Sequence, residues 1–240
     1  MDALSNDILA ELERTLDYRF VNRSLLEEAM THRSFLNESA DRKVKDNERL
    51  EFFGDAVIDF FLSRALLDRF PDSREGALTR IRASLVGEES LGNLARRVGL
   101  GRYLRMGRGE EKSGGREKRS ILADAYEALL AAVYLDGGPA PLQSLVEVHF
   151  GPLLEASDPT IGRDCKTEFQ ELTQSIYGSV PRYVHKKPEG PDHARIFTVQ
   201  AFIGDELLGE GSGSTKKEAE QEAARVGLER LTPRVPTGVS

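Results

Sequence analysis

The sequence predicts a multidomain chain, with an all-α domain followed by a small α+β domain. From Ser5 to about Leu154, apolar residues recur at spacings of three and four, which is typical of successive helices. Three short strand-like runs follow, placed between two helical segments in the order α-β-β-β-α. A length of 240 residues with 39% hydrophobic residues is sufficient for two hydrophobic cores.

Turn residues predict the domain boundaries. In the helical domain, assigned to residues 1–155, Pro71 bounds one helix, and Gly137-Gly138-Pro139 ends another after Leu135. Residues 156–163 are mostly small and polar, with a Pro and a Gly, and predict a linker. The second domain is expected over residues 164–232, and the tail over 233–240 is expected to be mobile.

The second domain is expected to open with a helix over residues 164–179. Strand-like runs cover 182–187, 195–203 and 207–211, with turn residues between them. A final helix is predicted over 215–231. One buried face is indicated on the middle strand by Phe197, Val199, Ala201 and Ile203, and another on the final helix by Ala224, Leu228 and Leu231.

Composition excludes several classes of protein. The longest apolar stretch, residues 128–135, is far shorter than the roughly 18 residues of a membrane span, and the first residues carry no basic signal region. The single cysteine, Cys165, cannot form an internal disulfide or a cysteine-rich zinc site. We therefore expect a non-exported, cytoplasmic protein with no membrane partner.

The charge balance argues against a nucleic-acid partner. The chain has 33 basic and 40 acidic residues, a net charge of −7, whereas affinity for nucleic acids comes from neutralising phosphates. Distribution matters more than the sum, because acids can gather at a metal site while a few cations line a separate face.

Two groups of acidic residues lie within apolar helical segments. Glu48, Glu51 and Asp55 are at i, i+3 and i+7, which places them within about 60° of one another on one helix face. Asp124 and Glu127 form an i, i+3 pair on another helix. Like charges stacked in this way destabilise a helix unless a cation compensates them. If the two helices cross, four carboxylates converge.

Oxygen ligands without His or Cys suit Mg²⁺ or Mn²⁺, and such sites hydrolyse phosphodiesters by activating water. The alternative is that these acids are helix-start residues favoured by the helix dipole, together with ordinary surface charge. Asp46 or Asn47 is expected to cap the first of the two helices. That helix is expected to be mostly buried, because it also carries Phe52, Phe53, Val57, Ile58, Phe60 and Phe61.

The acidic residues lie in segments that resemble the ribonuclease III family. Residues 47–57, Asn-Glu-Arg-Leu-Glu-Phe-Phe-Gly-Asp-Ala-Val, are similar to the family's signature. Thr31-His-Arg-Ser34, Lys112-Ser-Gly-Gly115 and Asp124-Ala-Tyr-Glu-Ala-Leu129 resemble its other motifs, in the expected order. The resemblance covers nearly the whole chain. Phe53 stands where the family more usually has Leu, which changes core packing and not chemistry.

The resemblance implies a catalytic Mg²⁺ site, with Mn²⁺ as a substitute. It makes Glu51, Asp124 and Glu127 metal ligands, and it places Asp55 with Glu127 in the catalytic group. Glu48, together with Glu75, matches acidic positions near the scissile strand.

The resemblance also implies a homodimer in which Phe52 enters a pocket of the other subunit, so that each of two acidic sites cuts one strand. Packing of Phe52 in the chain's own core is the alternative. We interpret His32 as a structural hydrogen-bonding residue, because one histidine without a second ligand is a poor metal site.

Three patches in the second domain resemble those of a double-stranded RNA-binding domain, which reads duplex shape across two minor grooves. Thr167, Gln170 and Glu171 share one helix face and can bond ribose 2′-hydroxyls, and His193 lies in the loop between the first two strands. Lys216 and Lys217 lie in the first turn of the last helix, where the dipole disfavours cations unless an anion binds.

The Gly-Ser-Gly-Ser run that precedes the two lysines is expected to allow a nucleic-acid backbone to approach. The alternative is that Glu218 and Glu220 screen the lysines as a solvated charged face. Glu220 also departs from the Lys common at that position. The domain has nine basic and twelve acidic residues, a net charge of −3, so its binding should come from a patch and be weak and salt-sensitive.

The resemblance therefore implies a double-strand-specific endoribonuclease that leaves 5′-phosphate and 3′-hydroxyl ends with short 3′ overhangs. Roles in ribosomal and messenger RNA processing follow from it, with double-stranded RNA and a second copy of the chain as partners and no small-molecule cofactor. A non-catalytic RNA-binding regulator is the alternative, although such a protein should have lost at least one of the four acids. A metal-storage bundle would not explain the attached RNA-binding domain.

Overall fold

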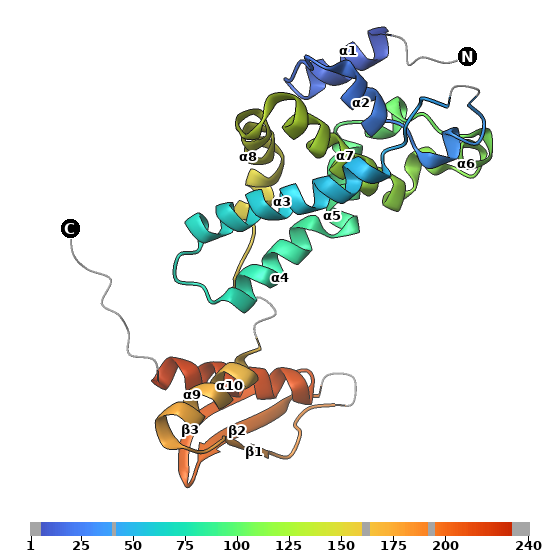
Figure 1. Ribbon diagram of the computed structural model, residues 1–240. Coiled ribbons are helices and arrows are strands. Elements are labelled where there is room, and N and C mark those ends of the chain that lie inside the picture. Colours follow the sequence, from blue (N-terminus) through green and yellow to red (C-terminus); the bar gives the residue numbers. More distant parts are fainter. Residues whose placement is uncertain (1–5, 40–41, 160–163, 192–194, 232–240) are drawn as a thin grey trace. The chain divides into compact units, whose positions relative to one another are not determined.

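The computed structural model describes residues 6–39, 42–159, 164–191 and 195–231 of the chain, which divides into two compact units. The units are Met1–Ile161 and Gly162–Ser240 (Figure 1). The predicted tail and the last four residues of the predicted linker lie outside the described residues.

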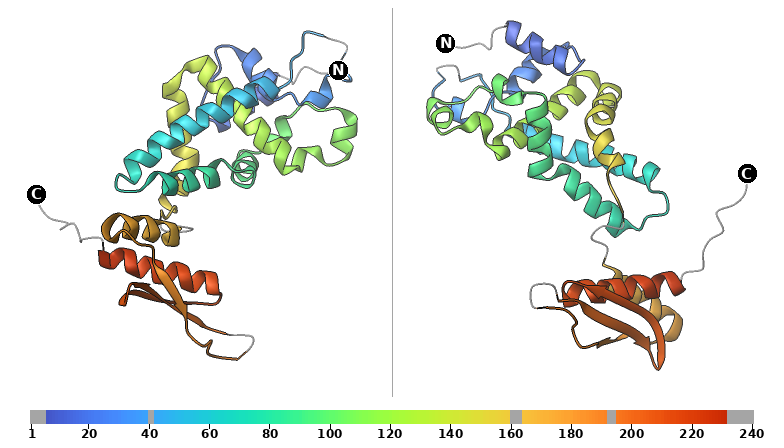
Figure 2. Two further views of the ribbon diagram at one scale, coloured as in Figure 1. Left: turned by 60° about the horizontal axis from the view of Figure 1, so that its bottom comes forward. Right: turned by 180° about the vertical axis from the view of Figure 1, so that it is seen from behind.

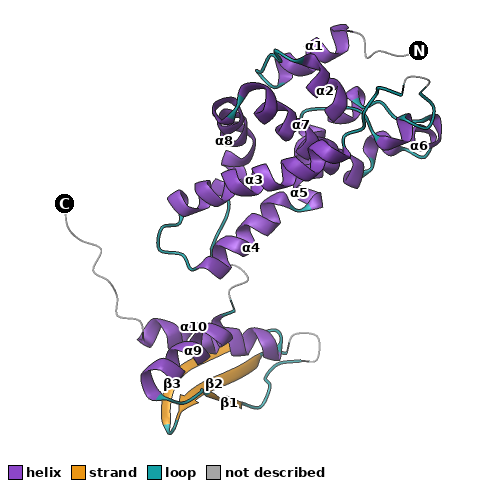
Figure 3. Ribbon diagram, viewed as in Figure 1, coloured by secondary structure: helices purple, strands orange, loops and turns teal. Residues whose placement is uncertain are grey.

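The described part of the first unit consists of helices and their connections, which confirms the all-α prediction (Figure 3). None of these helices is both long and apolar enough to cross a membrane, and the same holds for the described helices of the second unit. The α-helices are α1 (Asn6–Thr15), α2 (Arg23–Ala29), α3 (Glu48–Arg69), α4 (Glu75–Val86), α5 (Glu88–Arg97), α6 (Arg108–Lys112), α7 (Arg119–Gly137) and α8 (Pro139–Glu155). Short 3₁₀ turns are η1 (Arg33–Phe35), η2 (Leu100–Tyr103) and η3 (Gly115–Glu117).

Helix α7 is the centre of this unit, and α2, α3, α5 and α8 pack against it (Figure 2). Between Ile121 and Val133 every residue of α7 is buried except Asp124 and Glu127. A run of this length stays helical without an amphipathic pattern because it is surrounded by other helices. Asp124 and Glu127 are thus two partly accessible acids within an otherwise buried stretch of helix.

Helices α3 and α7 cross with their backbones in close approach. A Cβ atom at Gly54 of α3 would lie 2.1 Å from the carbonyl oxygen of Glu127 on α7. No L side chain fits there, so a glycine is required at this crossing. The crossing brings the acidic residues of the two helices to the same place.

The prediction that α3 is mostly buried is wrong for the single chain. Its inner face is buried as expected, but Phe52 is 82% exposed, Phe60 is 69% exposed and Leu67 is 59% exposed. At 100° per residue, Phe60 and Leu67 lie about 20° apart around the helix and Phe52 lies about 60° to 80° from them, so the three positions fall on one side of α3. At the start of the helix, the carboxylate of Asp46 accepts a hydrogen bond from the Glu48 N–H at 3.3 Å, whereas Asn47 makes no side-chain cap.

The second unit has the predicted α-β-β-β-α order. It comprises α9 (Cys165–Tyr177), β1 (Arg182–His185), β2 (Phe197–Ile203), β3 (Glu206–Gly213) and α10 (Lys216–Leu231). The strands form one antiparallel sheet in the order β1-β2-β3, and both helices lie on one side of it (Figure 1). The alternation on β2 is confirmed, since Val199 and Ala201 are fully buried against Phe169 and α10.

Strand β3 begins one residue earlier and ends two residues later than predicted, and its glycines face α10. A Cβ at Gly209 would lie 2.1 Å from the carbonyl oxygen of Ala223, and one at Gly211 would lie 2.2 Å from the Ala223 nitrogen. A Cβ at Gly213 would lie 2.6 Å from the Cβ of Glu218. The expectation that this glycine run admits a nucleic-acid backbone is therefore wrong at Gly211 and Gly213, where the space is taken by the protein's own helix.

Candidate active site

The acidic residues of α3 and α7 come together at the Gly54 crossing. Asp55 is exposed at this point, whereas Glu51, Asp124 and Glu127 are half-buried. Each of the three half-buried carboxylates has a pKa that is raised by burial and by the charge of at least one neighbouring acid. Asp55 and Asp124 are among the charges that raise the pKa values of Glu51 and Glu127, so the acids of the two helices lie within electrostatic range of one another.

Glu127 is the most strongly perturbed of these groups. Burial, followed by the charges of Asp55, Glu51 and Asp124, raises the pKa of Glu127 to about 8. A carboxylate in such surroundings either takes up a proton or requires a cation. The position of Glu127 on a core helix, with its backbone against Gly54, leaves its side chain little freedom to reach open solvent.

Glu51 on α3 and Asp124 on α7 are the other two half-buried acids of the crossing. Burial and the charge of Asp124 raise the pKa of Glu51, and burial and the charge of Glu88 raise that of Asp124. The guanidinium of Arg33 opposes both shifts but does not cancel them. The local charge of the site is therefore negative in spite of this arginine.

The donor set fits a hard divalent cation in its chemistry. All four groups supply carboxylate oxygen, which Mg²⁺ and Mn²⁺ prefer, and a cation would relieve the repulsion recorded in the raised pKa values. Within the described residues, no three His, Cys, Asp or Glu side chains are already gathered as a metal-binding group. Mg²⁺ is usually bound through a few carboxylates and keeps several of its waters, whereas Ca²⁺ takes a cage of oxygen ligands.

Glu48 and Glu75, which the resemblance places near the scissile strand, have different surroundings from the four acids at the crossing. Glu48 is exposed and pairs with Arg33, whose Nη1 lies 3.2 Å from its Oε1, and its charge contributes to the raised pKa of Glu51. Glu75 opens α4 and accepts a hydrogen bond from the Thr79 hydroxyl at 2.7 Å. No hydrogen bond or ion pair between described residues joins Glu75 to the other acids.

Sequence reasoning missed two acids near the site. Asp59 raises the pKa of Glu127 and lies with its Oδ1 3.5 Å from Arg82 Nε. It follows Asp55 by four residues on the same face of α3, so the periodicity that identified Glu51 and Asp55 would also have found it. Glu88 opens α5 and pairs with Arg119 at 3.4 Å, and no local sequence signal connects it with Asp124.

His32 takes the structural position that the sequence suggested. It is the N-cap of η1, and its Nδ1 accepts a hydrogen bond from the Ser34 N–H at 3.3 Å. The Ser34 hydroxyl lies 2.8 Å from the same Nδ1 and accepts a hydrogen bond from the Gly107 N–H at 2.9 Å. This network ties the first motif of the chain to the segment that leads into α6.

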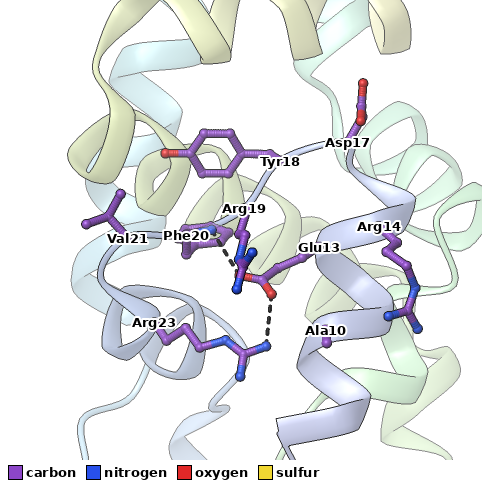
Figure 4. A pocket seen from close by; sticks show the side chains of 9 residues that line it. All are labelled: Ala10, Glu13, Arg14, Asp17, Tyr18, Arg19, Phe20, Val21 and Arg23. Carbon is purple, nitrogen blue, oxygen red and sulfur yellow. Dashed lines mark hydrogen bonds and ion pairs between the residues drawn. The ribbon is translucent and has the colours of Figure 1, made fainter.

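An open groove lies elsewhere in the first unit, between α1 and the segment that follows it (Figure 4). Inside it, the buried Glu13 accepts hydrogen bonds of 2.9 Å from the Phe20 N–H and from Arg23 Nη2. None of the acids at the α3–α7 crossing lines this groove. The groove is lined by Ala10, Glu13, Arg14, Asp17, Tyr18, Arg19, Phe20, Val21 and Arg23.

In the second unit, Lys216 and Lys217 are exposed in the first turn of α10, as predicted. The glutamates proposed to screen them have other partners. Glu218 accepts hydrogen bonds from the N–H and the hydroxyl of Ser214 at 2.9 and 2.6 Å. Glu220 pairs with Lys166 at 2.5 Å and with His185 at 3.1 Å. No ion pair between described residues neutralises either lysine, which disfavours the screening alternative.

The predicted polar strip on α9 is present, but one of its side chains already makes a hydrogen bond within the protein. Thr167, Gln170 and Glu171 are all exposed, and the Thr167 hydroxyl donates a hydrogen bond of 2.8 Å to Asp164. Asp164 also accepts from Gln221 Nε2 of α10 at 2.9 Å, so the start of α9 is fastened to the helix that carries the lysines. His193 lies outside the described residues.

Comparisons with known proteins agree with this division of the chain. Residues 22–152 match the family model described as ribonuclease-III-like, and residues 165–231 match the model of the double-stranded RNA binding motif. The ribonuclease 3 of Geobacter sulfurreducens is 58% identical over 221 residues, which cover 92% of this chain and 89% of that protein. The ribonuclease 3 of Geobacter metallireducens is 57% identical over 224 residues, covering 92% and 91%.

A solved structure also resembles the first unit. The nuclease domain of ribonuclease III from Campylobacter jejuni, described with structural flexibility in a region involved in dimer formation, is 39% identical and superposes with a TM-score of 0.54. The match covers 60% of this chain and 99% of that one. Taken with the family models and the Geobacter relatives, this shows that the chain belongs to the ribonuclease III family, whose members are endoribonucleases that hydrolyse double-stranded RNA.

Proposed function

We propose that the cluster of Glu51, Asp55, Asp124 and Glu127 is the centre at which the RNA strand is cut, with Mg²⁺ as the metal. The observation that carries this proposal is the α3–α7 crossing at Gly54, which holds acids from two helices together inside a mostly apolar unit. Burying carboxylates that repel one another costs free energy unless a cation or a proton neutralises them. Perturbed acids of this kind are typical of functional sites.

In this proposal Glu51, Asp124 and Glu127 hold the metal and Asp55 completes the acidic set. When bound, the ion supplies a nucleophilic water and neutralises charge on the scissile phosphate. The chain's own residues fix the geometry: the α7 backbone against Gly54 sets the position of Glu127, and Arg33 holds Glu48 at the edge of the cluster. We infer hydrolysis to 5′-phosphate and 3′-hydroxyl ends with short 3′ overhangs, in the processing of ribosomal and messenger RNA.

A long RNA duplex incubated with the full-length protein tests this assignment. We expect cleavage of both strands with Mg²⁺ and with Mn²⁺, and intact RNA when the divalent cation is chelated. Binding of the duplex without cleavage in Mg²⁺ would support the regulator alternative instead.

We further propose that the chain acts as a homodimer through the exposed face of α3. Phe52, Phe60 and Leu67 are large apolar side chains exposed on one side of that helix, and exposed apolar patches mark sites of association. The Campylobacter nuclease domain has a region involved in dimer formation, which is consistent with this use. Two acidic sites on one dimer would cut the two strands of one duplex.

Phe52→Ala is expected to weaken dimerisation more than folding. Because Phe52 is 82% exposed in the single chain, its truncation removes little buried area within the subunit, whereas an interface would lose an aromatic anchor. Sedimentation equilibrium measures the dimer dissociation constant, and thermal unfolding measures stability. Val148→Ala on α8, where Val148 is 69% exposed, is the control and should leave the dimer unchanged. An unchanged Phe52→Ala dimer with a lowered melting temperature would favour the core interpretation.

RNA binding is assigned to the second domain, with Lys216 and Lys217 as its principal phosphate contacts and Thr167, Gln170, Glu171 and His193 at the minor grooves. The two ammonium groups are exposed and have no acidic partner among the described residues, and the positive end of the α10 dipole favours anions. We keep residues 1–155 as the catalytic domain, 156–163 as the linker and 164–232 as the RNA-binding domain, in a protein of the cytoplasm.

The double variant Lys216→Ala/Lys217→Ala is expected to lose affinity for duplex RNA of any sequence. If each lysine neutralises about one phosphate, the slope of log K against log salt should flatten by about two units or somewhat less. Folding should survive, because removing cations from a helix N-terminus is neutral or mildly favourable.

Filter binding across a salt series measures this slope. Arg230→Ala removes a cation from the last turn of the same helix and should leave the slope unchanged. A double variant with unchanged affinity and salt slope would show that RNA docks elsewhere.

A further inference from the structure

The imidazole of His32 has a defined proton position. The Ser34 hydroxyl accepts a hydrogen bond from the Gly107 N–H, so its own proton is directed to the other neighbour, the Nδ1 of His32 at 2.8 Å. The Ser34 N–H also donates to Nδ1. With two donors directed at it, Nδ1 is the unprotonated acceptor, and the ring proton is on Nε2.

The Nε2–H of His32 has no hydrogen-bond partner among the described residues. It belongs to a ring that is held firmly, because the His32 N–H donates to the carbonyl of Arg105 at 2.9 Å and the Arg105 side chain donates to the Thr31 hydroxyl at 2.7 Å. The Nε2 atom is not one of the buried side-chain atoms that lack a partner in the described part of the chain, so it is open to solvent and a ligand can reach it.

The residues on either side of His32 contact the start of α3, because the Thr31 carbonyl accepts a hydrogen bond from the Asn47 N–H at 2.9 Å and Arg33 pairs with Glu48 at 3.2 Å. The charges of Glu110, Asp124 and Glu48 all act on His32, and in return the charge of His32 acts on Asp124. Burial nevertheless lowers the pKa of His32, so the ring is neutral near pH 7. A neutral donor adds no positive charge that would compete with a divalent cation at the same site.

We propose that the Nε2–H of His32 donates a hydrogen bond to a backbone oxygen of the RNA strand held at the acidic cluster. An RNA strand presents acceptors of this kind along its whole length, both phosphate oxygens and 2′-hydroxyls. The nearby cation, Arg33, is already engaged by Glu48. The role of His32 is thus to position the strand, in addition to capping η1, and this inference rests on the proposed site of cutting.

Two variants separate the positioning role from the capping role. In His32→Asn, the side-chain oxygen occupies the place of Nδ1 and can still accept from the Ser34 N–H, but no donor remains at the place of Nε2. In His32→Gln, the amide NH₂ reaches the place of Nε2, but the cap is lost. The full-length proteins are compared by thermal unfolding and by single-turnover cleavage of a long RNA duplex at saturating enzyme.

We expect His32→Asn to keep its melting temperature and to cleave about tenfold more slowly, as for the loss of one hydrogen bond to a charged acceptor. His32→Gln should melt at a lower temperature and, below that temperature, cleave closer to the wild-type rate than His32→Asn does. The Mg²⁺ concentration for half-maximal cleavage should be unchanged in His32→Asn.

Wild-type cleavage by His32→Asn, or an equal loss in both variants that follows their stability, would overturn the proposal and leave His32 a structural cap. A shift of the Mg²⁺ midpoint in His32→Asn would also overturn it, because the donor would then be holding a ligand carboxylate and not RNA. Cleavage by Glu127→Gln would also overturn the proposal that the acidic cluster is the cutting centre. If Glu127→Gln is inactive and His32→Asn is fully active, only the inference about His32 is overturned.

Discussion

Glu127→Gln is expected to abolish cleavage while leaving RNA binding intact. The substitution keeps the size of the half-buried side chain but removes the carboxylate, which is the group proposed to hold the metal. Loss of a single group in a metal-assisted site typically lowers the rate by a factor on the order of 1,000 or more. Binding should persist because it is assigned to the second domain.

Cleavage is measured on a uniform RNA duplex in Mg²⁺, and binding is measured by gel shift with the divalent cation chelated. Glu147→Gln is a matched control, because Glu147 is an exposed acid of the same unit that accepts a hydrogen bond from Gln143 on α8. Cleavage by Glu127→Gln at a rate near that of Glu147→Gln would show that the acidic cluster is not the cutting centre.

The same variant should be more stable than the wild type when no divalent cation is present. The pKa of Glu127 is raised in the fold from 4.5 to about 8, so between these pH values the folded chain binds a proton that the unfolded chain has released. Stability therefore falls as the pH rises through this window, and Glu127→Gln is insensitive to it. In EDTA the variant should melt higher than the wild type at pH 8 and level with it near pH 4; a lower melting temperature at pH 8 would contradict the burial argument.

Gly54→Ala is expected to destabilise the first unit strongly and to silence the enzyme. The added Cβ would lie 2.1 Å from the carbonyl oxygen of Glu127 and 2.5 Å from its carbonyl carbon, and both are backbone atoms of a core helix that cannot turn aside. Helices α3 and α7 must then separate, at a cost of about 3 kcal/mol or more. Separation also moves Glu51 and Asp55 away from Asp124 and Glu127.

Gly76→Ala in α4 is the matched control, because the nearest atom to its new Cβ would be an Arg80 side-chain nitrogen at 3.6 Å. A helical Gly→Ala change without a clash stabilises by up to about 1 kcal/mol. Urea unfolding and duplex cleavage are measured for both variants. Equal stability of Gly54→Ala and the wild type would show that the two helices do not need this close approach.

The order of elements and the acid pairs were predictable from the sequence because both depend on local spacing. Glu51 and Asp55 share a helix face by periodicity alone, and so do Asp124 and Glu127. The meeting of the two acidic faces depends on the close approach at Gly54 and on the packing of α7. Both are features of the tertiary structure, which local sequence spacing does not give. Glu88 reaches Asp124 from a third helix, and its contribution was therefore invisible in the sequence.

Apolar periodicity alone did not predict the exposed side of α3, because it is the same for a residue that faces its own core and one that faces a partner; the family resemblance singled out Phe52 but not Phe60 or Leu67. Phe52 and Val57 look alike in the sequence, yet one is 82% exposed and the other is 8% exposed. The glycines of β3 were misjudged for a related reason: Gly211 is typical of a flexible approach to a ligand, but it is also typical of two protein backbones in contact.

The ion pairs of Glu220 bear on how fast cleaved RNA dissociates from the enzyme. Glu220 pairs with Lys166 of α9 and His185 of β1, and Arg225 and Arg230 of α10 also have acidic partners, so the ammonium groups of Lys216 and Lys217 are the cations of α10 that no described acid neutralises. Complexes held by few phosphate contacts dissociate quickly at physiological salt, and a cut duplex offers fewer phosphates than an intact one. We therefore expect short residence times for the products, so that repeated turnover is limited by the cutting step and not by the departure of the fragments.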